Sequence, residues 1–263
     1  MVERLPLGPD SVAWRIHADA SMIVGGLRAL MIQACEPRAM AGVDQHSDYR
    51  HDPWGRLRRT SEFVLGTTYG DADRARRLAR RVRGVHATVT GTDPATGLAY
   101  RADDPDLLLW IHAVEVHSFL VAYRTYAGAV TREDADRYVR EMAMVNELIG
   151  LPPEMAPQSI GELREYLRSV PGLAVTPAAR EGLWTLLAPP MPLRFRPLWV
   201  IPISAAVAIL PKRIREMYGL PWFEPATPAV RAAVYPLARI LNVWLPKNPI
   251  ITEALAREER QAS

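Results

Sequence analysis

Cysteine is almost absent from this sequence, with Cys35 the single one among 263 residues. One cysteine cannot form an internal disulfide, and cysteine-rich zinc sites are excluded with it. A glycine-rich phosphate loop, a Gly-x-Ser-x-Gly nucleophile elbow and a His-Glu-x-x-His zinc motif are also missing. The sequence therefore gives no support to a nucleotide-binding protein, a serine hydrolase or a zinc protease. No activating base is identifiable for Cys35, so we predict a structural residue.

Targeting signals and long apolar runs are missing as well. The segment MVERLPLGP at the start has no apolar core and no twin arginine, so we expect no export signal and a cytoplasmic location. The longest apolar run, near residues 198–210, is broken by Pro202 and is shorter than the about 20 residues that span a bilayer. We expect a buried helix there. Because Trp199 and Trp222 flank a basic region, peripheral membrane contact is the most that we expect.

The charge balance is nearly even, with a formal net charge of +3. The arginines are spread along several predicted helices, without a basic tail and without interleaved aromatic residues. We therefore expect no binding to nucleic acid. With 49% hydrophobic and 23% charged residues, the composition is that of a globular protein whose core needs no disulfides.

Helical periodicity dominates the chain, and no convincing strand pattern appears. Four predicted helices have both ends: about residues 11–34, Asp71 or Asp73 to Gly91, 106–126, and Thr131 to Gly150. Two more begin at Pro53 and at Ser159. Shorter helices follow from Pro190 to about Trp244, with a kink at Pro236. Residues 36–52 and 92–104 are predicted loops. We expect an all-α fold, with a single compact helical domain over residues 1–250 and a charged, frayed C-terminal tail over residues 251–263.

His86 is the most informative residue of the chain. It belongs to an apolar stripe on the third predicted helix, and arginines occupy the opposite side. The other members of the stripe are Ala75, Leu78, Ala79, Val82, Val85 and Val89. The imidazole must therefore face the core, where a polar group without a partner is costly. Its partner is either a backbone carbonyl or carboxylate, or a metal bound through one ring nitrogen.

His112 and Glu115 lie one turn apart on the wholly apolar helix predicted over residues 106–126, and His117 projects from another face. The pair is either a buried histidine oriented by a carboxylate or part of a metal site. A helical di-iron site needs paired Glu-x-x-His motifs with further carboxylates, and the sequence has none in that order.

Arg56 and Thr60 recur at helical spacing on one face of the helix that starts at Pro53, and we predict that this face is inward. A buried arginine requires an anion. That anion is a protein carboxylate, an acidic group of a cofactor or an oxygen of a substrate. Thr60 offers a hydroxyl donor beside it.

Several motifs occur together in an order that resembles the rubber-oxygenase catalytic domain. That family includes the bacterial latex clearing proteins and the fungal oxygenase that cleaves a prenyl chain in mycophenolic acid synthesis. The matching segments are DSVAW (10–14), GGLRA (25–29), DYRHDPWGRLRRT (48–60), YGD (69–71), RVRGVH (81–86), YRADDP (100–105), WIHA (110–113), SFL (118–120) and DRY (136–138). The likeness spans about residues 8–170.

The resemblance implies a helical fold that encloses a pocket for one b-type haem. In the family, the proximal histidine that binds the haem iron matches His86. The family's arginine and threonine near the haem match Arg56 and Thr60, and its Trp-x-His histidine, close to the haem, matches His112. The resemblance also implies that the protein uses dioxygen on a small lipophilic substrate, isoprenoid or aromatic, with an electron donor as a further partner.

One residue departs from the family pattern, because Glu36-Pro37 stands where many relatives have His-Pro. Glu36 is either a catalytic base or a residue that only changes a contact. The leading hypothesis is a haem-dependent oxygenase. The alternatives are a haem-binding sensor or carrier without turnover, and a helical interaction domain whose core histidines are structural.

Overall fold

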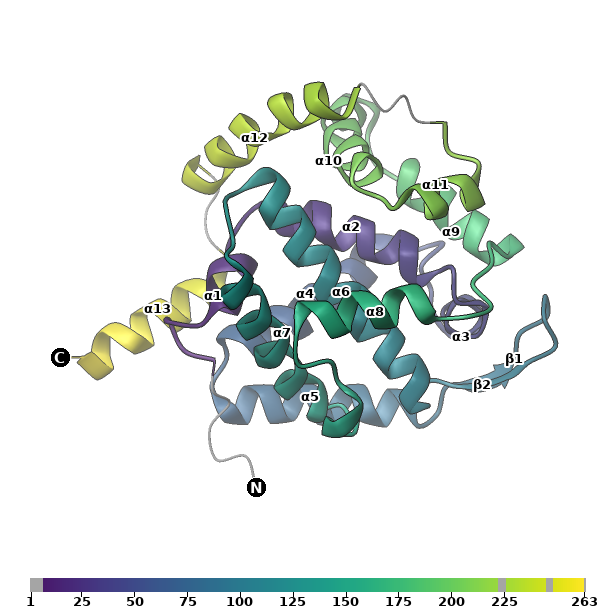
Figure 1. The fold of residues 1–263 in the computed structure, drawn as a ribbon, viewed down its shortest axis with the longest axis horizontal. Helices are drawn as coiled ribbons and strands as arrows, with labels where there is room; N and C mark the ends of the chain where they lie inside the picture. Colours follow the sequence, from purple (N-terminus) through teal and green to yellow (C-terminus); the bar gives the residue numbers. More distant parts are fainter. Residues whose placement is uncertain (1–6, 222–225, 245–247, 263) are drawn as a thin grey trace.

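The computed structural model describes residues 7–221, 226–244 and 248–262. Over these ranges the chain is a helical assembly with one small two-stranded sheet (Figure 1), which confirms the all-α prediction. Its helices are α1 (Val12–His17), α2 (Ser21–Gln33), α3 (Pro37–His46), α4 (Pro53–Tyr69), α5 (Ala72–His86), α6 (Pro105–Tyr126), α7 (Arg132–Glu147), α8 (Ile160–Ser169), α9 (Pro177–Leu187), α10 (Arg196–Ala208), α11 (Lys212–Tyr218), α12 (Ala226–Trp244) and α13 (Pro249–Ala262). Two short 3-10 helices, η1 (Pro153–Met155) and η2 (Leu193–Phe195), lie between them.

The first predicted helix is two helices, because α1 and α2 are separated by residues 18–20. Side chains satisfy backbone groups at the break: Asn242 Oδ1 accepts from the Ala20 N–H at 2.7 Å, and Asp19 Oδ1 accepts from the Ser21 N–H at 2.8 Å. The buried His17 ring, at the end of α1, contacts Thr68 Oγ1 and Tyr138 Oη, each at 2.8 Å. These partners are distant in sequence, so the local pattern of residues 11–34 does not reveal the break.

Both predicted loops contain regular structure. Residues 36–52 include α3, which Glu36 caps and Pro37 begins. Residues 92–104 include the second strand of an antiparallel hairpin, in which β1 (Thr90–Thr92) pairs with β2 (Ala99–Arg101). The hairpin extends from one edge of the molecule (Figure 1), and α5 ends at His86 rather than at Gly91.

The central helix is α6, which packs along α2. Gly25 permits this close approach, since a Cβ there would lie 2.8 Å from Phe119 Cδ1 and 3.1 Å from the Phe119 Cα. Among the described helices, α6 alone is by itself long and apolar enough to cross a membrane, but 67% of its apolar window is buried inside the protein. We therefore interpret α6 as a core helix.

The apolar run near residues 198–210 lies in α10. Its second half is buried at Ile203 and Ala205, as predicted, but Leu198 and Val200 in its first half are exposed. The segment from η2 through α10 is long and apolar enough to cross a membrane only when α11 is counted with it. The two parts are bent from each other by 119°. Trp222 lies outside the described residues.

The predicted frayed tail is wrong for the described residues, because 251–262 belong to α13. Ile251 and Ala254 are buried in the core, and Arg257 Nη2 donates to the Tyr69 carbonyl at 2.9 Å. The described part of the tail therefore packs against the helical domain, and the predicted boundary at residue 250 falls inside a helix. Pro236 lies within α12.

Candidate functional site

The His86 side chain lies at the C-terminal end of α5 and is half-buried. Its Nδ1 atom is fully buried and has no hydrogen-bond partner among the described residues. Burial lowers the pKa of His86 below its usual value, and the charge of Asp103 opposes that shift. A neutral imidazole with an unpartnered nitrogen is the form that binds a metal ion.

The orientation of α5 agrees with the prediction in most respects. Ala75 and Ala79 are buried on the side that carries His86, whereas Arg77 and Arg80 on the other side are exposed. Val85 departs from the predicted stripe, because it is 54% exposed. The apolar face is therefore narrower than the sequence indicates, but it still turns His86 inward.

Helices α4 and α5 form an antiparallel hairpin whose register can be read from two close contacts. A Cβ on Gly66 would lie 2.3 Å from Leu78 Cδ1, and one on Gly70 would lie 3.0 Å from Arg74 Cδ. These contacts set the register of the two helices near their turn. At the other end, the Ser47 that binds Arg56 directly follows His46, whose Nε2 contacts the carbonyl of Thr90 at 3.1 Å, four residues after His86.

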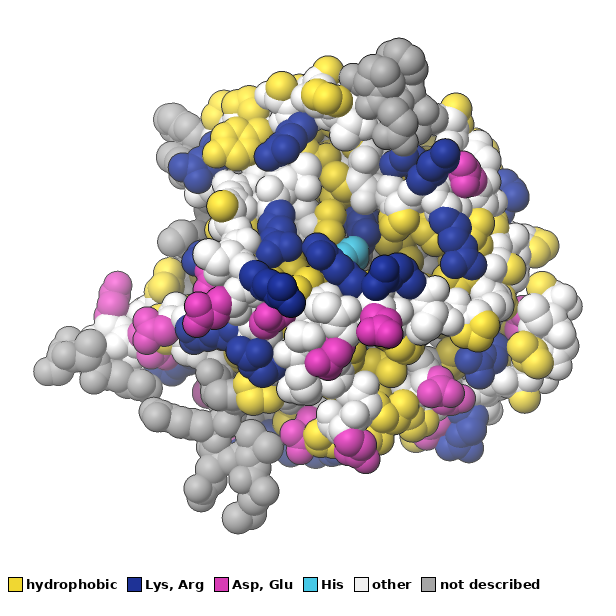
Figure 2. Space-filling model, in the orientation of Figure 1, with side chains coloured by type: hydrophobic (Ala, Val, Ile, Leu, Met, Phe, Trp, Pro, Cys, Tyr) yellow, Lys and Arg dark blue, Asp and Glu magenta, His cyan; other side chains and the backbone are white. Residues whose placement is uncertain are grey.

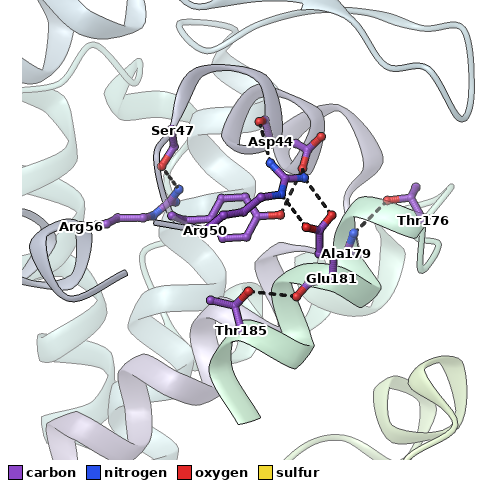
Figure 3. A network of polar contacts seen from close by, with 9 residues as sticks. Asp44, Ser47, Arg50, Arg56, Thr176, Ala179, Glu181 and Thr185 are labelled. Atoms are coloured by element: carbon purple, nitrogen blue, oxygen red, sulfur yellow. Dashed lines mark hydrogen bonds and ion pairs between the residues drawn. The ribbon is translucent and has the colours of Figure 1, made fainter. Parts of the chain in front are cut away.

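Arg56 has no carboxylate partner among the described residues. Its Nη1 donates to Ser47 Oγ at 2.7 Å, which is the one side-chain hydrogen bond recorded for it (Figure 3). Burial lowers the pKa of Arg56, and the charge of Arg59 lowers it further, against the opposing influence of Tyr49. A largely desolvated cation without a counter-ion is a group prepared to bind an anion.

Arg50, which lies nearby, has the carboxylate partners that Arg56 lacks. Its guanidinium binds both carboxylate oxygens of Glu181, at 2.6 and 2.8 Å, and also contacts Asp44 (Figure 3). The contrast with Arg56 is therefore not caused by a general lack of acidic groups in this region.

Thr60 differs from the prediction, because its side chain is exposed rather than inward-facing. The neighbouring positions on the same face follow the prediction, with Val64 and Thr67 buried. Thr60 therefore lies at an exposed position between the part-buried Arg56 and the buried Val64, where its hydroxyl is accessible to a ligand.

His112 is buried on α6, and its Nε2 atom has no hydrogen-bond partner among the described residues. Burial lowers its pKa to about 3, so the ring is neutral. Glu115 makes no recorded hydrogen bond to it, and burial raises the pKa of this carboxyl group to about 7. The predicted alternative in which Glu115 orients the His112 ring is therefore not formed.

Glu36 is 7% exposed, and both of its carboxylate oxygens have structural partners. Oε2 accepts from the Ala39 N–H at 2.6 Å and caps α3, while Oε1 accepts from Arg38 Nε at 2.8 Å. These contacts agree with the second predicted role, in which Glu36 only changes a contact relative to the histidine of the family pattern. They give no support to a catalytic base.

Two residues of interest escaped the sequence analysis. Ser47 holds Arg56, but it follows α3 in a stretch that was predicted to be an irregular loop. Arg28 is 2% exposed on α2 and binds Ser118 Oγ at 2.6 Å and the Ile209 carbonyl at 3.0 Å, without a carboxylate. Its position within the apolar pattern of α2 is the sequence feature that could have indicated a buried arginine.

The donor groups of the described residues fit a cofactor that takes a single imidazole from the protein. They contain no cluster of three or more His, Cys, Asp or Glu side chains that could hold a metal ion. They do contain two buried histidine nitrogens without partners and two largely buried arginines, Arg56 and Arg28, without a carboxylate partner. A haem iron takes one imidazole as an axial ligand, and arginine can bind its acidic propionates.

Comparisons with known proteins agree with the helical fold. The family model of the ER-bound oxygenase mpaB/B'/rubber oxygenase catalytic domain matches residues 14–241. The solved structure of Latex Clearing Protein LCP in the closed state is similar with a TM-score of 0.59 and 20% identity, over 94% of this chain and 72% of that one. A comparison with curated proteins gave no match. The chain therefore belongs to the family of mpaB-type and rubber oxygenase catalytic domains, and it is an oxygenase.

Proposed function

We propose that this oxygenase depends on a b-type haem bound by His86, and that it uses dioxygen to oxidise a small lipophilic metabolite. The observation that carries the proposal is the buried His86 Nδ1, which has no hydrogen-bond partner among the described residues, on the helix that follows the one carrying Arg56, an arginine without a counter-ion. Neither of the ordinary partners of a core histidine, a backbone carbonyl or a carboxylate, accounts for His86 Nδ1 among the described residues.

His86 is the proposed axial ligand, because the neutral ring that burial favours has a lone pair available for iron. When bound, the haem supplies the iron-centred redox chemistry that dioxygen activation requires. Extraction with acidified acetone should remove the haem, since one cysteine excludes the two-cysteine motif of covalent attachment.

Arg56 and Thr60 are the proposed polar groups of the pocket. Arg56 binds an acidic group, either a haem propionate or an oxygen of the substrate, through charge-assisted hydrogen bonds. Thr60 donates its hydroxyl one turn further along α4. His112 is the proposed pocket residue that contributes a neutral ring without serving as the iron ligand.

The lipophilic substrate class rests on the family, which includes rubber oxygenases. Within that class we propose an isoprenoid or aromatic compound of small size. An electron donor completes the proposed set of partners. The proposed location is the cytoplasm, with at most peripheral membrane contact.

The direct test is to express the protein with adequate haem supply and to record its absorption spectrum and its oxygen consumption. We expect a Soret band and oxygen uptake that depends on an isoprenoid alkene or a phenol. A colourless, iron-free preparation would overturn the haem proposal. A pigmented protein that consumes no oxygen with any of these substrates would instead identify a sensor or carrier.

A further inference from the structure

A basic cavity lies where the C-terminal end of α6 meets the starts of α7 and α8. It has a volume of about 340 Å³ and is lined by Arg124, Arg132, Ile160, Gly161 and Arg164. Figure 2 shows basic side chains gathered in the middle of this face of the molecule, around one histidine. We call these five lining residues the arginine cavity.

The three arginines of the cavity form no ion pair among the described residues. Arg124 Nη2 donates to the carbonyls of Val130 and Thr131, at 3.0 and 3.2 Å, and these are neutral groups. Arg132 and Arg164 are exposed and make no recorded side-chain hydrogen bond. Three like charges that share one cavity repel one another unless an anion joins them.

The lining of the cavity contains no carboxylate. Asp136, whose charge acts on Arg124, accepts through Oδ1 from the Ile160 N–H at 2.8 Å, so it is engaged at the start of α8. The pKa of Arg124 is nevertheless lowered, by burial first and then by the charge of Arg164, against the opposing charge of Asp136.

The start of α8 adds a backbone donor to the cavity. Ser159 Oγ accepts from the Glu162 N–H at 3.2 Å, and Asp136 accepts from the Ile160 N–H, which leaves the Gly161 N–H between them without a recorded acceptor. Gly161 lines the cavity and has no side chain to cover that donor. The N-terminus of a helix carries a partial positive charge and binds phosphate groups through such free N–H groups.

The charge behind the cavity is positive as well. The half-buried His117 ring lies 3.4 Å from Arg28 Nη2, and its pKa is lowered to about 3 by burial and by the charges of Arg28, Arg164 and Arg124. Since Arg28 itself has no carboxylate partner, the positive potential of the cavity extends into the protein.

We propose that the arginine cavity binds the phosphate or diphosphate group of a small molecule. Arginine guanidinium groups bind phosphate oxygens in pairs, and a multiply charged anion suits a lining of three arginines without a carboxylate. A second surface cavity differs in having a carboxylate in its lining, because Glu147 lies there with Arg76, Arg80 and Arg83. The proposal does not depend on haem, because Arg124 lies twelve residues after His112, about 18 Å along α6.

The test is isothermal titration calorimetry of the full chain at constant ionic strength, with inorganic phosphate, inorganic diphosphate and dimethylallyl diphosphate as probes. We compare the wild type with the double variant Arg132→Gln/Arg164→Gln. The matched control is Arg80→Gln/Arg83→Gln, which removes the same two charges from exposed arginines in the cavity that contains Glu147. Circular dichroism confirms that each variant folds, as expected for exposed side chains.

We expect diphosphate to bind the wild type and the Arg80→Gln/Arg83→Gln control alike, and Arg132→Gln/Arg164→Gln about a hundredfold more weakly, since each charged hydrogen-bond partner contributes about tenfold. Tighter binding of dimethylallyl diphosphate than of inorganic diphosphate would identify an organic phosphate ester as the ligand class. Equal binding would identify the free anion. The absence of heat with all three probes at millimolar concentration, or equal binding by Arg132→Gln/Arg164→Gln, overturns the proposal.

Discussion

Replacing Arg56 by methionine is expected to impair oxidation while leaving the haem-free protein at least as stable as the wild type. Methionine keeps most of the apolar stem of the arginine and removes its charge. The variant loses the hydrogen bond to Ser47 Oγ, which is worth about 1.5–3 kcal/mol for a charged donor. It also removes a desolvated ion without a counter-ion, whose burial costs several kcal/mol.

The two contributions predict a free energy of unfolding that is unchanged or higher by about 1 kcal/mol, which for a chain of this size raises Tm by about 2–4 °C. Oxygen consumption by the haem-loaded variant should fall about a hundredfold or more, as when a group that stabilises developing charge is removed. Thermal unfolding of the haem-free protein and an oxygen electrode provide the two measurements.

Arg50→Met is the matched control, because Arg50 has carboxylate partners where Arg56 has none (Figure 3). The Arg50 side chain is 33% exposed, so solvent screens its ion pairs and we expect a loss of only about 1 kcal/mol, without an effect on turnover. A destabilisation of Arg56→Met by about 3 kcal/mol or more would instead show that Arg56 is half of a buried structural pair.

Two further predictions concern buried carboxyl groups. Burial raises the pKa of Glu115 to about 7. Between the usual pKa of a glutamate and pH 7, the folded chain therefore binds more protons than the unfolded chain. The free energy of unfolding falls as the pH rises through that window. Urea unfolding at pH 5 and pH 8 should show this loss in the wild type but not in Glu115→Gln. Glu141→Ala should lower the free energy of unfolding by about 3 kcal/mol, because Glu141 accepts from the N–H groups of Val12 and Ala13 at the start of α1. A loss below about 1 kcal/mol in urea titration would contradict this role as the cap of α1.

The parts of the fold that the sequence predicts well are those whose signals are local. Thr131 and Ser159 cap α7 and α8 as predicted, because each side chain accepts from a backbone N–H three residues later. Asp71 does the same for α5. The apolar face of α5 follows from its own periodicity, so the inward orientation of His86 could be predicted as well.

The parts that the sequence missed depend on distant partners. The β1–β2 hairpin is too short to show an alternating pattern, and Tyr100 is buried there with its hydroxyl donating to Gln45, on α3. The exposure of Thr60 depends on what covers the N-terminal half of α4, which periodicity cannot report. Residues 251–262 read as a charged tail, yet Ile251 and Ala254 are enough to pack α13 against the core.

His86 is the proposed ligand of the haem iron, and the absorption spectra of three proteins purified under haem supplementation test this assignment: the wild type, His86→Ala and His112→Ala. We predict a Soret band for the wild type, its loss in His86→Ala with partial recovery on addition of imidazole, and its retention, at reduced occupancy, in His112→Ala. An unchanged spectrum for His86→Ala together with loss of haem from His112→Ala would contradict the claim.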